Sequence, residues 1–170
     1  MTNVTIGEPQ TAEDIAAVRQ LCWAYRDHLI AHSPEQRDII ELFYPEDAYS
    51  DLMDRLDQEH ARPDGVILLA KKDGTPVGCG MSHRLSPTEV ELKRIYVDDA
   101  ARGTGLGRAL CEGLIAQART DGYQTVLLDT SQKLTSARAL YAALGFKERG
   151  PYQPVPEIAL PLLCFFELSL

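Results

Sequence analysis

The sequence has few cysteines and no long apolar run, and these two absences exclude several classes of protein. Its four cysteines among 170 residues are scattered, without CxxC spacing or a nearby histidine partner, which argues against a zinc site and a disulfide framework. No apolar run reaches the ~20 residues needed to span a bilayer, and the N-terminus lacks the basic and apolar regions of a signal peptide. We therefore expect reduced thiols, no metal, no membrane partner and a cytoplasmic location.

Basic residues are also scarce. Lysine and arginine total 17 against 25 aspartate and glutamate residues, which gives a formal net charge of -8. Because neutralising a phosphate backbone needs a broad Lys/Arg surface, we do not expect nucleic acid as the main partner. A cationic acceptor is more compatible with this charge. The length suits one domain, since domains commonly run ~100 to 200 residues, so residues 1–170 are expected to form a single unit.

The hydrophobic pattern predicts an α/β domain with a mixed sheet. Short apolar runs between turn residues predict strands at residues 4–7, 66–70, 77–83, 90–97, 126–129 and 160–168. Helical spacing and start or stop signals predict helices after Thr11, on both sides of Pro45, at residues 109–118, and from a Thr135 or Ser136 cap to Gly145. No repeat or long linker interrupts this order.

A glycine-rich loop separates the 90–97 strand from the 109–118 helix. It consists of Arg102, Gly103, Thr104, Gly105, Leu106, Gly107 and Arg108. Glycines let the backbone approach a ligand closely, and a helix that starts there directs unpaired N–H groups at the same point, which favours a phosphate. The loop is not a P-loop, because no Lys-Ser or Lys-Thr follows, and the third glycine of a dinucleotide fingerprint is replaced by Arg108.

Three segments together carry a resemblance to a known family. The loop fits the pattern Arg/Gln-x-x-Gly-x-Gly/Ala through Arg102, Gly105 and Gly107. Upstream, Glu91–Val97 is similar to the fourth strand of the GCN5-related N-acetyltransferase (GNAT) family, and downstream Ala137–Phe146 is similar to its last helix. All three occur in the family's order. The chain therefore resembles the GNAT family.

The resemblance covers Val77–Phe146 well and implies a fold and an acyl donor. The fold would be that of a GNAT-like acyl-CoA N-acyltransferase, with a mixed, mostly antiparallel central sheet flanked by helices. The donor would be acetyl-CoA. Its pantetheine arm would pair with the backbone of Ile95, Tyr96 and Val97, and its pyrophosphate would lie across Arg102–Arg108. An amine would attack the thioester directly in a ternary complex.

Two catalytic residues follow from the same resemblance. Tyr141 would protonate the leaving coenzyme A, although an aromatic at helical spacing is also typical of a core residue. Glu91 would accept the proton of the amine, although its alternation with Val90 and Leu92 also fits a solvated strand face. In place of Glu91, the imidazole of His83 would suit a base, and the phenol of Tyr96 could orient the acceptor.

One residue departs from the common pattern of the family, and the tail of the chain resembles that of a subset of its members. Many members carry an asparagine seven residues before the helix tyrosine, but this chain has Leu134 there, so that cofactor contact is not carried over. A subset without the asparagine keeps a tail like residues 151–156, which makes Tyr152 a candidate acceptor-binding residue. A Pro-rich segment is also simply a rigid turn.

The acceptor is encoded mainly between residues 25 and 60. Asp47, Asp51 and Asp54 share one helix face there and would attract an ammonium group, unless they form a solvated face. We expect a small primary amine, such as an amino acid or a polyamine, with a protein N-terminus or lysine left open. Other readings are a non-catalytic acyl-CoA sensor, or an interaction protein with a plain turn at the loop. Similar proteins are commonly homodimers, and residues 160–166 could contribute to such an interface.

Overall fold

A seven-stranded sheet runs through the protein, for which a computed structural model describes residues 2–170. Its order is β1-β2-β3-β4-β5-β7-β6. The strands are β1 (Val4–Gly7), β2 (Val66–Lys72), β3 (Thr75–Arg84), β4 (Glu89–Val97), β5 (Thr125–Ser131), β6 (Lys147–Arg149) and β7 (Leu163–Ser169). Only β4 and β5 are parallel neighbours, and every other pair is antiparallel. The expected mixed, mostly antiparallel sheet is confirmed.

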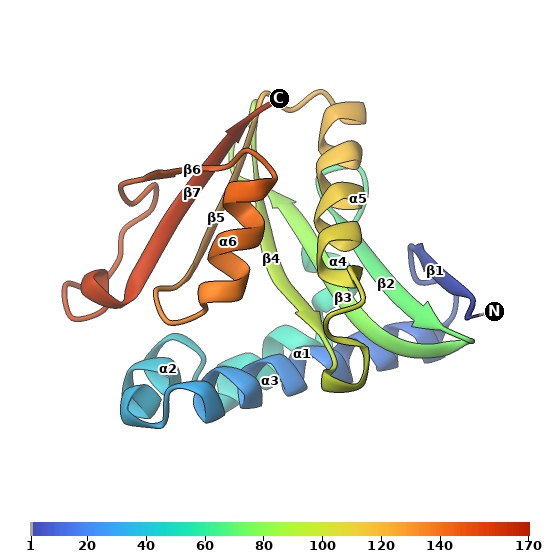
Figure 1. The fold of residues 1–170 in the computed structure, drawn as a ribbon, viewed down its shortest axis with the longest axis horizontal. Helices are drawn as coiled ribbons and strands as arrows, with labels where there is room; N and C mark the ends of the chain where they lie inside the picture. The colour runs from blue at the N-terminus through green and yellow to red at the C-terminus, as the bar shows by residue number, and fades with distance from the viewer. Residues whose placement is uncertain (1) are drawn as a thin grey trace.

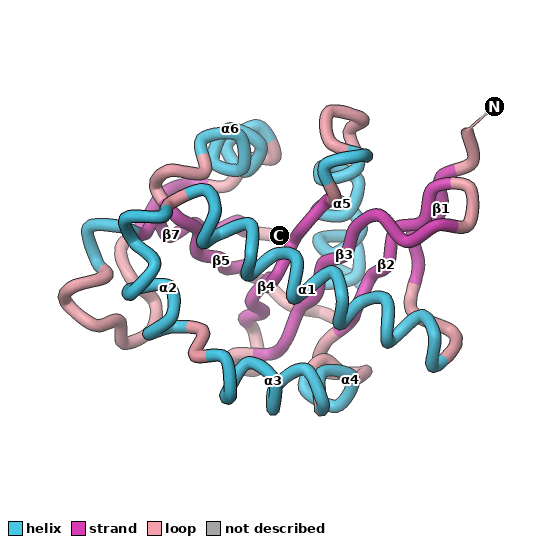
Figure 2. Tube along the Cα trace, turned by 90° about the horizontal axis from the view of Figure 1, so that it is seen from below, coloured by secondary structure: helices cyan, strands magenta, loops and turns pink. Residues whose placement is uncertain are grey.

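Helices cover both faces of this sheet. They are α1 (Ala12–His32), α2 (Arg37–Phe43), α3 (Glu46–Asp54), α4 (Leu56–Glu59), α5 (Leu106–Thr120) and α6 (Thr135–Ala143). Figure 1 shows α5 and α6 in front of the sheet, with α1 crossing beneath it. The turned view of Figure 2 places α5 and α6 on one side of the strands and α3 and α4 on the other.

Each face of the sheet has its own core. The α5 face buries Leu106, Leu110 and Leu114, which recur every four residues and therefore share one side of the helix. The opposite face buries Val18 of α1 and Met53 of α3. Fully burying each large apolar side chain stabilises the fold by ~1.5 to 3 kcal/mol, so these two layers hold the strands in place.

Several element boundaries differ from the sequence-based predictions. The final strand begins at Leu163 rather than 160, because Pro161 lies in a short 3-10 turn and cannot donate to a strand ladder. Helix α6 begins at Thr135 with Leu134 as its N-cap and no side-chain cap bond, so the expected Thr135 or Ser136 cap is wrong. The short elements α4 and β6 were not anticipated, because they carry too few residues to show a period.

The central strands β4 and β5 pair over only a short stretch and then separate. Their ladder ends at the pair Glu91↔Leu127, although β5 stays paired with β7 as far as Ser131. On its other side β4 shifts register against β3, and Arg94 in this β-bulge adopts a left-handed φ of 49°. Figure 1 shows the two strands diverging toward α1. Beyond Glu91, β4 therefore presents a backbone edge that β5 does not cover.

Candidate active site

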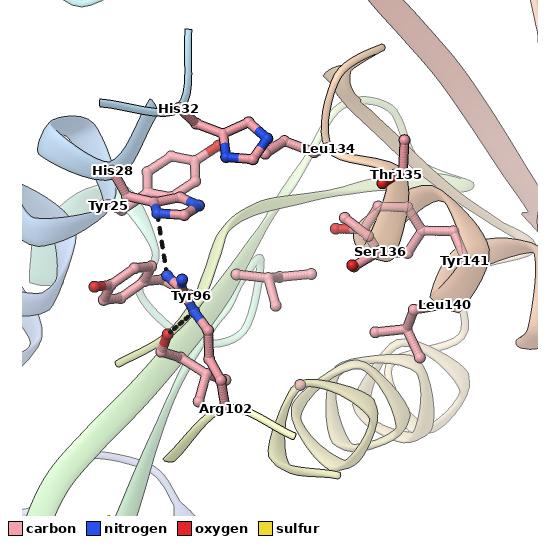
Figure 3. A pocket seen from close by; sticks show the side chains of 14 residues that line it. Tyr25, His28, His32, Tyr96, Arg102, Leu134, Thr135, Ser136, Leu140 and Tyr141 are labelled. Carbon is pink, nitrogen blue, oxygen red and sulfur yellow. Dashed lines mark hydrogen bonds between the residues drawn. The ribbon is translucent and has the colours of Figure 1, made fainter. Parts of the chain in front are cut away.

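The gap between the diverging strands leads into a cavity of about 300 Å³. Its walls come from α1, the end of β4, the glycine loop and α6. Figure 3 shows Tyr25, His28 and His32 on one side, with Ser136 and Tyr141 facing them from α6. The cavity is thus built from segments that are far apart in sequence and are brought together by the opening of the sheet.

The glycine loop ends in an uncapped helix N-terminus. Gly105 is the N-cap of α5 and has a φ of 82°, a left-handed conformation that favours glycine. No side chain caps the helix, and its first turn contains no acidic residue. The first helical bond runs from the Ala109 N–H to the Gly105 carbonyl, so the preceding N–H groups of the first turn have no partner within the helix. These features fit the predicted anion site.

The two arginines that bracket the loop are already engaged in ion pairs. Arg102 lies 2.5 Å from the carboxylate of Asp99 and 3.1 Å from Nδ1 of His28, and it also donates to the Val97 carbonyl. Arg108 pairs with Glu112 at 2.9 Å. Both pairs are exposed to solvent and therefore weak, so the arginines remain available to an anion beside the backbone N–H groups.

The predicted pantetheine-binding residues lie along the cavity floor. Ile95, Tyr96 and Val97 all line it. Tyr96 is only 9% exposed and packs beneath the guanidinium of Arg102, 5.7 Å from its ring centre. The uncovered edge of β4 therefore runs directly toward the glycine loop, as an extended ligand that pairs with a strand requires.

Tyr141 belongs both to the core and to the cavity wall. It is 7% exposed, and its ring packs against Phe146 and Phe166 at centre distances of 5.8 and 5.7 Å. Burial raises the pKa of its phenol above the usual value, so the group is protonated at neutral pH. Within residues 2–170 its hydroxyl forms no side-chain hydrogen bond, and the residue lines the cavity. The packing of the ring is typical of a core residue, and its place in the cavity wall is compatible with the predicted proton donor.

Glu91 is buried in a dense network. It is 2% exposed, and its carboxylate accepts hydrogen bonds from His83 at 2.7 Å and from the Tyr152 hydroxyl at 2.5 Å. Lys93 lies 3.6 Å away. Burial opposes its ionisation, but His83, Lys93 and Tyr152 outweigh this effect and lower the pKa of Glu91 to about 2. Such a carboxylate binds protons weakly, and the hydroxyl of Tyr152 is occupied by this bond.

Asp129 is a titratable group at the site that sequence reasoning missed. It stands on β5 two positions beyond the last residue paired with β4 and lines a narrow cavity of about 50 Å³ together with Tyr141. Although Asp129 is exposed at this opening, partial desolvation raises its pKa, and Glu91 adds to the rise while Lys93 and the Tyr152 hydroxyl oppose it. A carboxylate with a raised pKa accepts a proton more readily than Glu91 does. The available signal was a charge at the end of the apolar run Val126–Leu128.

A third cavity of about 290 Å³ lies beneath α3. It shares Tyr44, Lys93 and Arg94 with the narrow cavity beside Asp129. The predicted region 25–60 does contribute to its walls. However, Asp47, Asp51 and Asp54 do not line it and are exposed on α3, which is the solvated-face alternative.

Comparison with known proteins assigns the family. Residues 33–146 match the model of the Acetyltransferase (GNAT) family. The chain belongs to the GNAT family. It is 34% identical over 147 residues to an IAA acetyltransferase of Azospirillum brasilense, covering 81% of this chain and 94% of that protein. It is 35% identical over 105 residues to an uncharacterized N-acetyltransferase of Schizosaccharomyces pombe, covering 59% of this chain and 64% of that protein, less than two thirds of its length.

Solved structures agree with the fold of this GNAT protein. PaiA N-acetyltransferase of Thermoplasma acidophilum, solved in complex with coenzyme A, superposes with a TM-score of 0.71 at 16% identity, over 99% of both chains. An acetyltransferase of Streptococcus agalactiae gives a TM-score of 0.75 at 19% identity over 98% of both. The recognised family, the fold class and the activity class, acetyl-CoA-dependent N-acetylation, are therefore confirmed.

Within residues 2–170 no group of three or more His, Cys, Asp or Glu side chains is arranged to hold a metal ion. In the same part of the chain, no helix combines the length and the apolar character needed to cross a bilayer. The four cysteines are free thiols in this structure, and all four are buried.

Proposed function

We propose that this GNAT protein transfers an acetyl group from acetyl-CoA to the primary amine of a small molecule, by direct attack within a ternary complex. The observation that carries the proposal is the arrangement of its cavities. A 300 Å³ cavity beside the glycine loop is followed by a narrow one between β4 and β5, which shares lining residues with a 290 Å³ cavity under α3. Volumes of this order suit small ligands, and a donor and an acceptor could meet at the narrow point.

The residues around the first cavity fit the donor. The first-turn N–H groups of α5 would hold the pyrophosphate, and the free edge of β4 from Ile95 to Val97 would hold the pantetheine arm. When bound there, acetyl-CoA supplies an activated acetyl thioester. The apolar side chain of Leu134 lines the same cavity at the position where many relatives have an asparagine. Because the pantetheine arm would bind to the backbone of β4, donor binding in our proposal does not require that asparagine.

Two side chains of the narrow cavity would move the protons. Tyr141, protonated at neutral pH, holds a proton for the sulfur that leaves as a thiol. Asp129 is positioned to accept the proton that the amine loses as its bond to the acetyl carbon forms. Glu91 remains the competing hypothesis for the base, and in our proposal its network with His83 and Tyr152 instead fixes the strand beside Asp129.

The Gly107→Trp substitution is expected to abolish coenzyme A binding. Gly107 lines the first cavity on α5 without a left-handed φ, and a Cβ there would meet only Leu140 at 3.8 Å and Val97 at 3.9 Å. An indole fills the cavity without the backbone strain that any side chain would meet at Gly105. The measurement is the melting temperature with and without acetyl-CoA, since a ligand at 100 times its dissociation constant stabilises the fold by ~2.7 kcal/mol.

The matched control is Gly107→Ala, whose methyl group makes only ordinary contacts and should keep the stabilisation by acetyl-CoA and by free coenzyme A. ATP and NAD should not stabilise the parent at matched concentration. Equal stabilisation of the tryptophan variant and the parent would place the donor elsewhere. Stabilisation by ATP or NAD instead of coenzyme A would remove the proposal's basis.

A further inference from the structure

The β-bulge of β4 carries a buried cation without a counter-ion. Arg94 is 7% exposed, and no carboxylate within residues 2–170 forms a salt bridge with it. Its Nε contacts the sulfur of Met81 at 3.4 Å, and its Nη2 lies 2.6 Å from Nε2 of His60. A buried guanidinium is costly unless a negative group pairs with it. Such a group can come from a ligand.

A neutral histidine holds this guanidinium in place. His60 is 2% exposed, and its Nδ1 lies 2.9 Å from the Ser82 carbonyl. Burial, together with the charge of Arg94, lowers the pKa of His60 to about 3, so the ring is neutral above mildly acidic pH. Its Nδ1–H then donates to Ser82, and its Nε2 accepts from Arg94. The contact orients Arg94 without neutralising it.

The cavity that Arg94 lines is cationic in an acidic protein. Besides Arg94, its charged lining residues are Lys93, Arg55 and Glu59. His60 and His83 also line it. The only carboxylate among these lining residues, Glu59, pairs with Arg55 at 3.1 Å. Lys93 faces the carboxylate of Glu91 at 3.6 Å, so among the lining cations Arg94 is the one without an acidic partner within residues 2–170.

We propose that Arg94 binds the carboxylate of the acceptor, which is therefore a molecule of the amino acid type rather than a polyamine. The inference rests on the proposed acetyl transfer and names the substrate class of that site. Arg94 and Lys93 line both the 290 Å³ cavity and the narrow cavity with Asp129, so one small molecule can place its carboxylate at Arg94 and its amine near Asp129. A planar guanidinium matches a carboxylate in geometry and in charge.

The test compares matched substrates that differ in one carboxylate. Acetylation of phenylalanine is measured against phenethylamine, and that of lysine against cadaverine, by release of the coenzyme A thiol. The parent should show a kcat/KM about 10- to 100-fold higher for a carboxylated acceptor than for its decarboxylated partner, because hydrogen bonds to charged groups contribute strongly. The Arg94→Met substitution should reduce this ratio to about 1.

Two other variants keep the test decisive. Arg94→Gln retains a donor for His60 and should lose the preference in the same way if the methionine variant folds poorly. Arg119→Met removes an exposed arginine near the end of α5 and should keep the full ratio. Equal kcat/KM for both members of each pair in the parent would overturn the inference, as would a ratio that Arg94→Met leaves unchanged.

Failure of the proposed function gives a different result. It would appear as coenzyme A binding without thiol release for any amine. The carboxylate site is then tested by binding alone, with N-acetylphenylalanine and N-acetylphenethylamine as probes of the melting temperature. Stabilisation by the acid alone, lost in Arg94→Met, supports the site whatever the reaction, whereas equal responses to both probes contradict it.

Discussion

Asp129→Asn is expected to lower kcat by at least ~100-fold, because general base catalysis by a positioned side chain typically contributes 10²- to 10⁴-fold. The substitution keeps the shape of the side chain and removes its ability to accept a proton. Asp129 lines the narrow cavity with Tyr141, and partial desolvation raises its pKa from the usual value. The measurement is steady-state thiol release with saturating acetyl-CoA and the best acceptor found.

The pH profile distinguishes a base from a merely structural carboxylate. In the parent, kcat/KM should rise with pH as Asp129 ionises, because only the carboxylate form accepts a proton. This rising limb should occur at a higher pH than for an ordinary aspartate, since the pKa of Asp129 is raised. The asparagine variant should lack this limb. Asp51→Asn on the exposed face of α3 is the matched control and should leave the profile unchanged.

Glu91 provides the competing outcome. Its pKa of about 2 keeps Glu91 ionised at every pH above ~4, so its titration produces no change in kcat/KM there. If Glu91→Gln abolishes turnover while Asp129→Asn retains normal turnover, the base is Glu91 and our assignment is wrong.

Tyr141→Phe is expected to lower kcat by ~100-fold while leaving coenzyme A affinity within about twofold, because only the proton donor is removed. The ring still packs against Phe146 and Phe166, so the fold should keep its stability. Since burial raises the pKa of this phenol above its usual 10, the parent stays protonated through the neutral range, and the deficit should persist there. Single-turnover thiol release and a separate binding titration measure the two quantities.

Tyr123→Phe is the control for loss of a tyrosine hydroxyl. Tyr123 donates to the Asp64 carbonyl at 2.9 Å, away from the lining of the three cavities, and its removal should not change kcat. Equal kcat for Tyr141→Phe and the parent would show that Tyr141 is only a core residue. A large loss of coenzyme A affinity would instead make it a binding residue.

Some features of the fold and of the candidate site could be predicted from short, contiguous segments of the sequence. The glycine loop, the strand before it and the helix of Tyr141 are each contiguous segments, so they could carry the resemblance to the GNAT family that implied a donor site. The sheet class followed from alternating strands and helices. The ion pairs of the loop's arginines could not be predicted from the motif, because Asp99 and Glu112 are not part of it.

Other parts of the site depend on tertiary structure. Asp129 enters the cavity only because β5 leaves β4 after Leu127, and no local pattern announces where a ladder ends. The environment of Arg94 depends on a bulge and on His60, which is 34 positions away. Likewise, Glu91 gains its low pKa from Tyr152, 61 positions downstream, as well as from its strand neighbours.

The most direct test of the central claim is the reaction itself. The parent protein is incubated with acetyl-CoA and a panel of small amines, amino acids and a lysine-containing peptide, while thiol release and the mass of each acceptor are followed. We expect a small amine to be acetylated on nitrogen in proportion to the thiol released, with no signal from Gly107→Trp. Tight coenzyme A binding with no acetylated small molecule, or acetylation of the peptide alone, would contradict it.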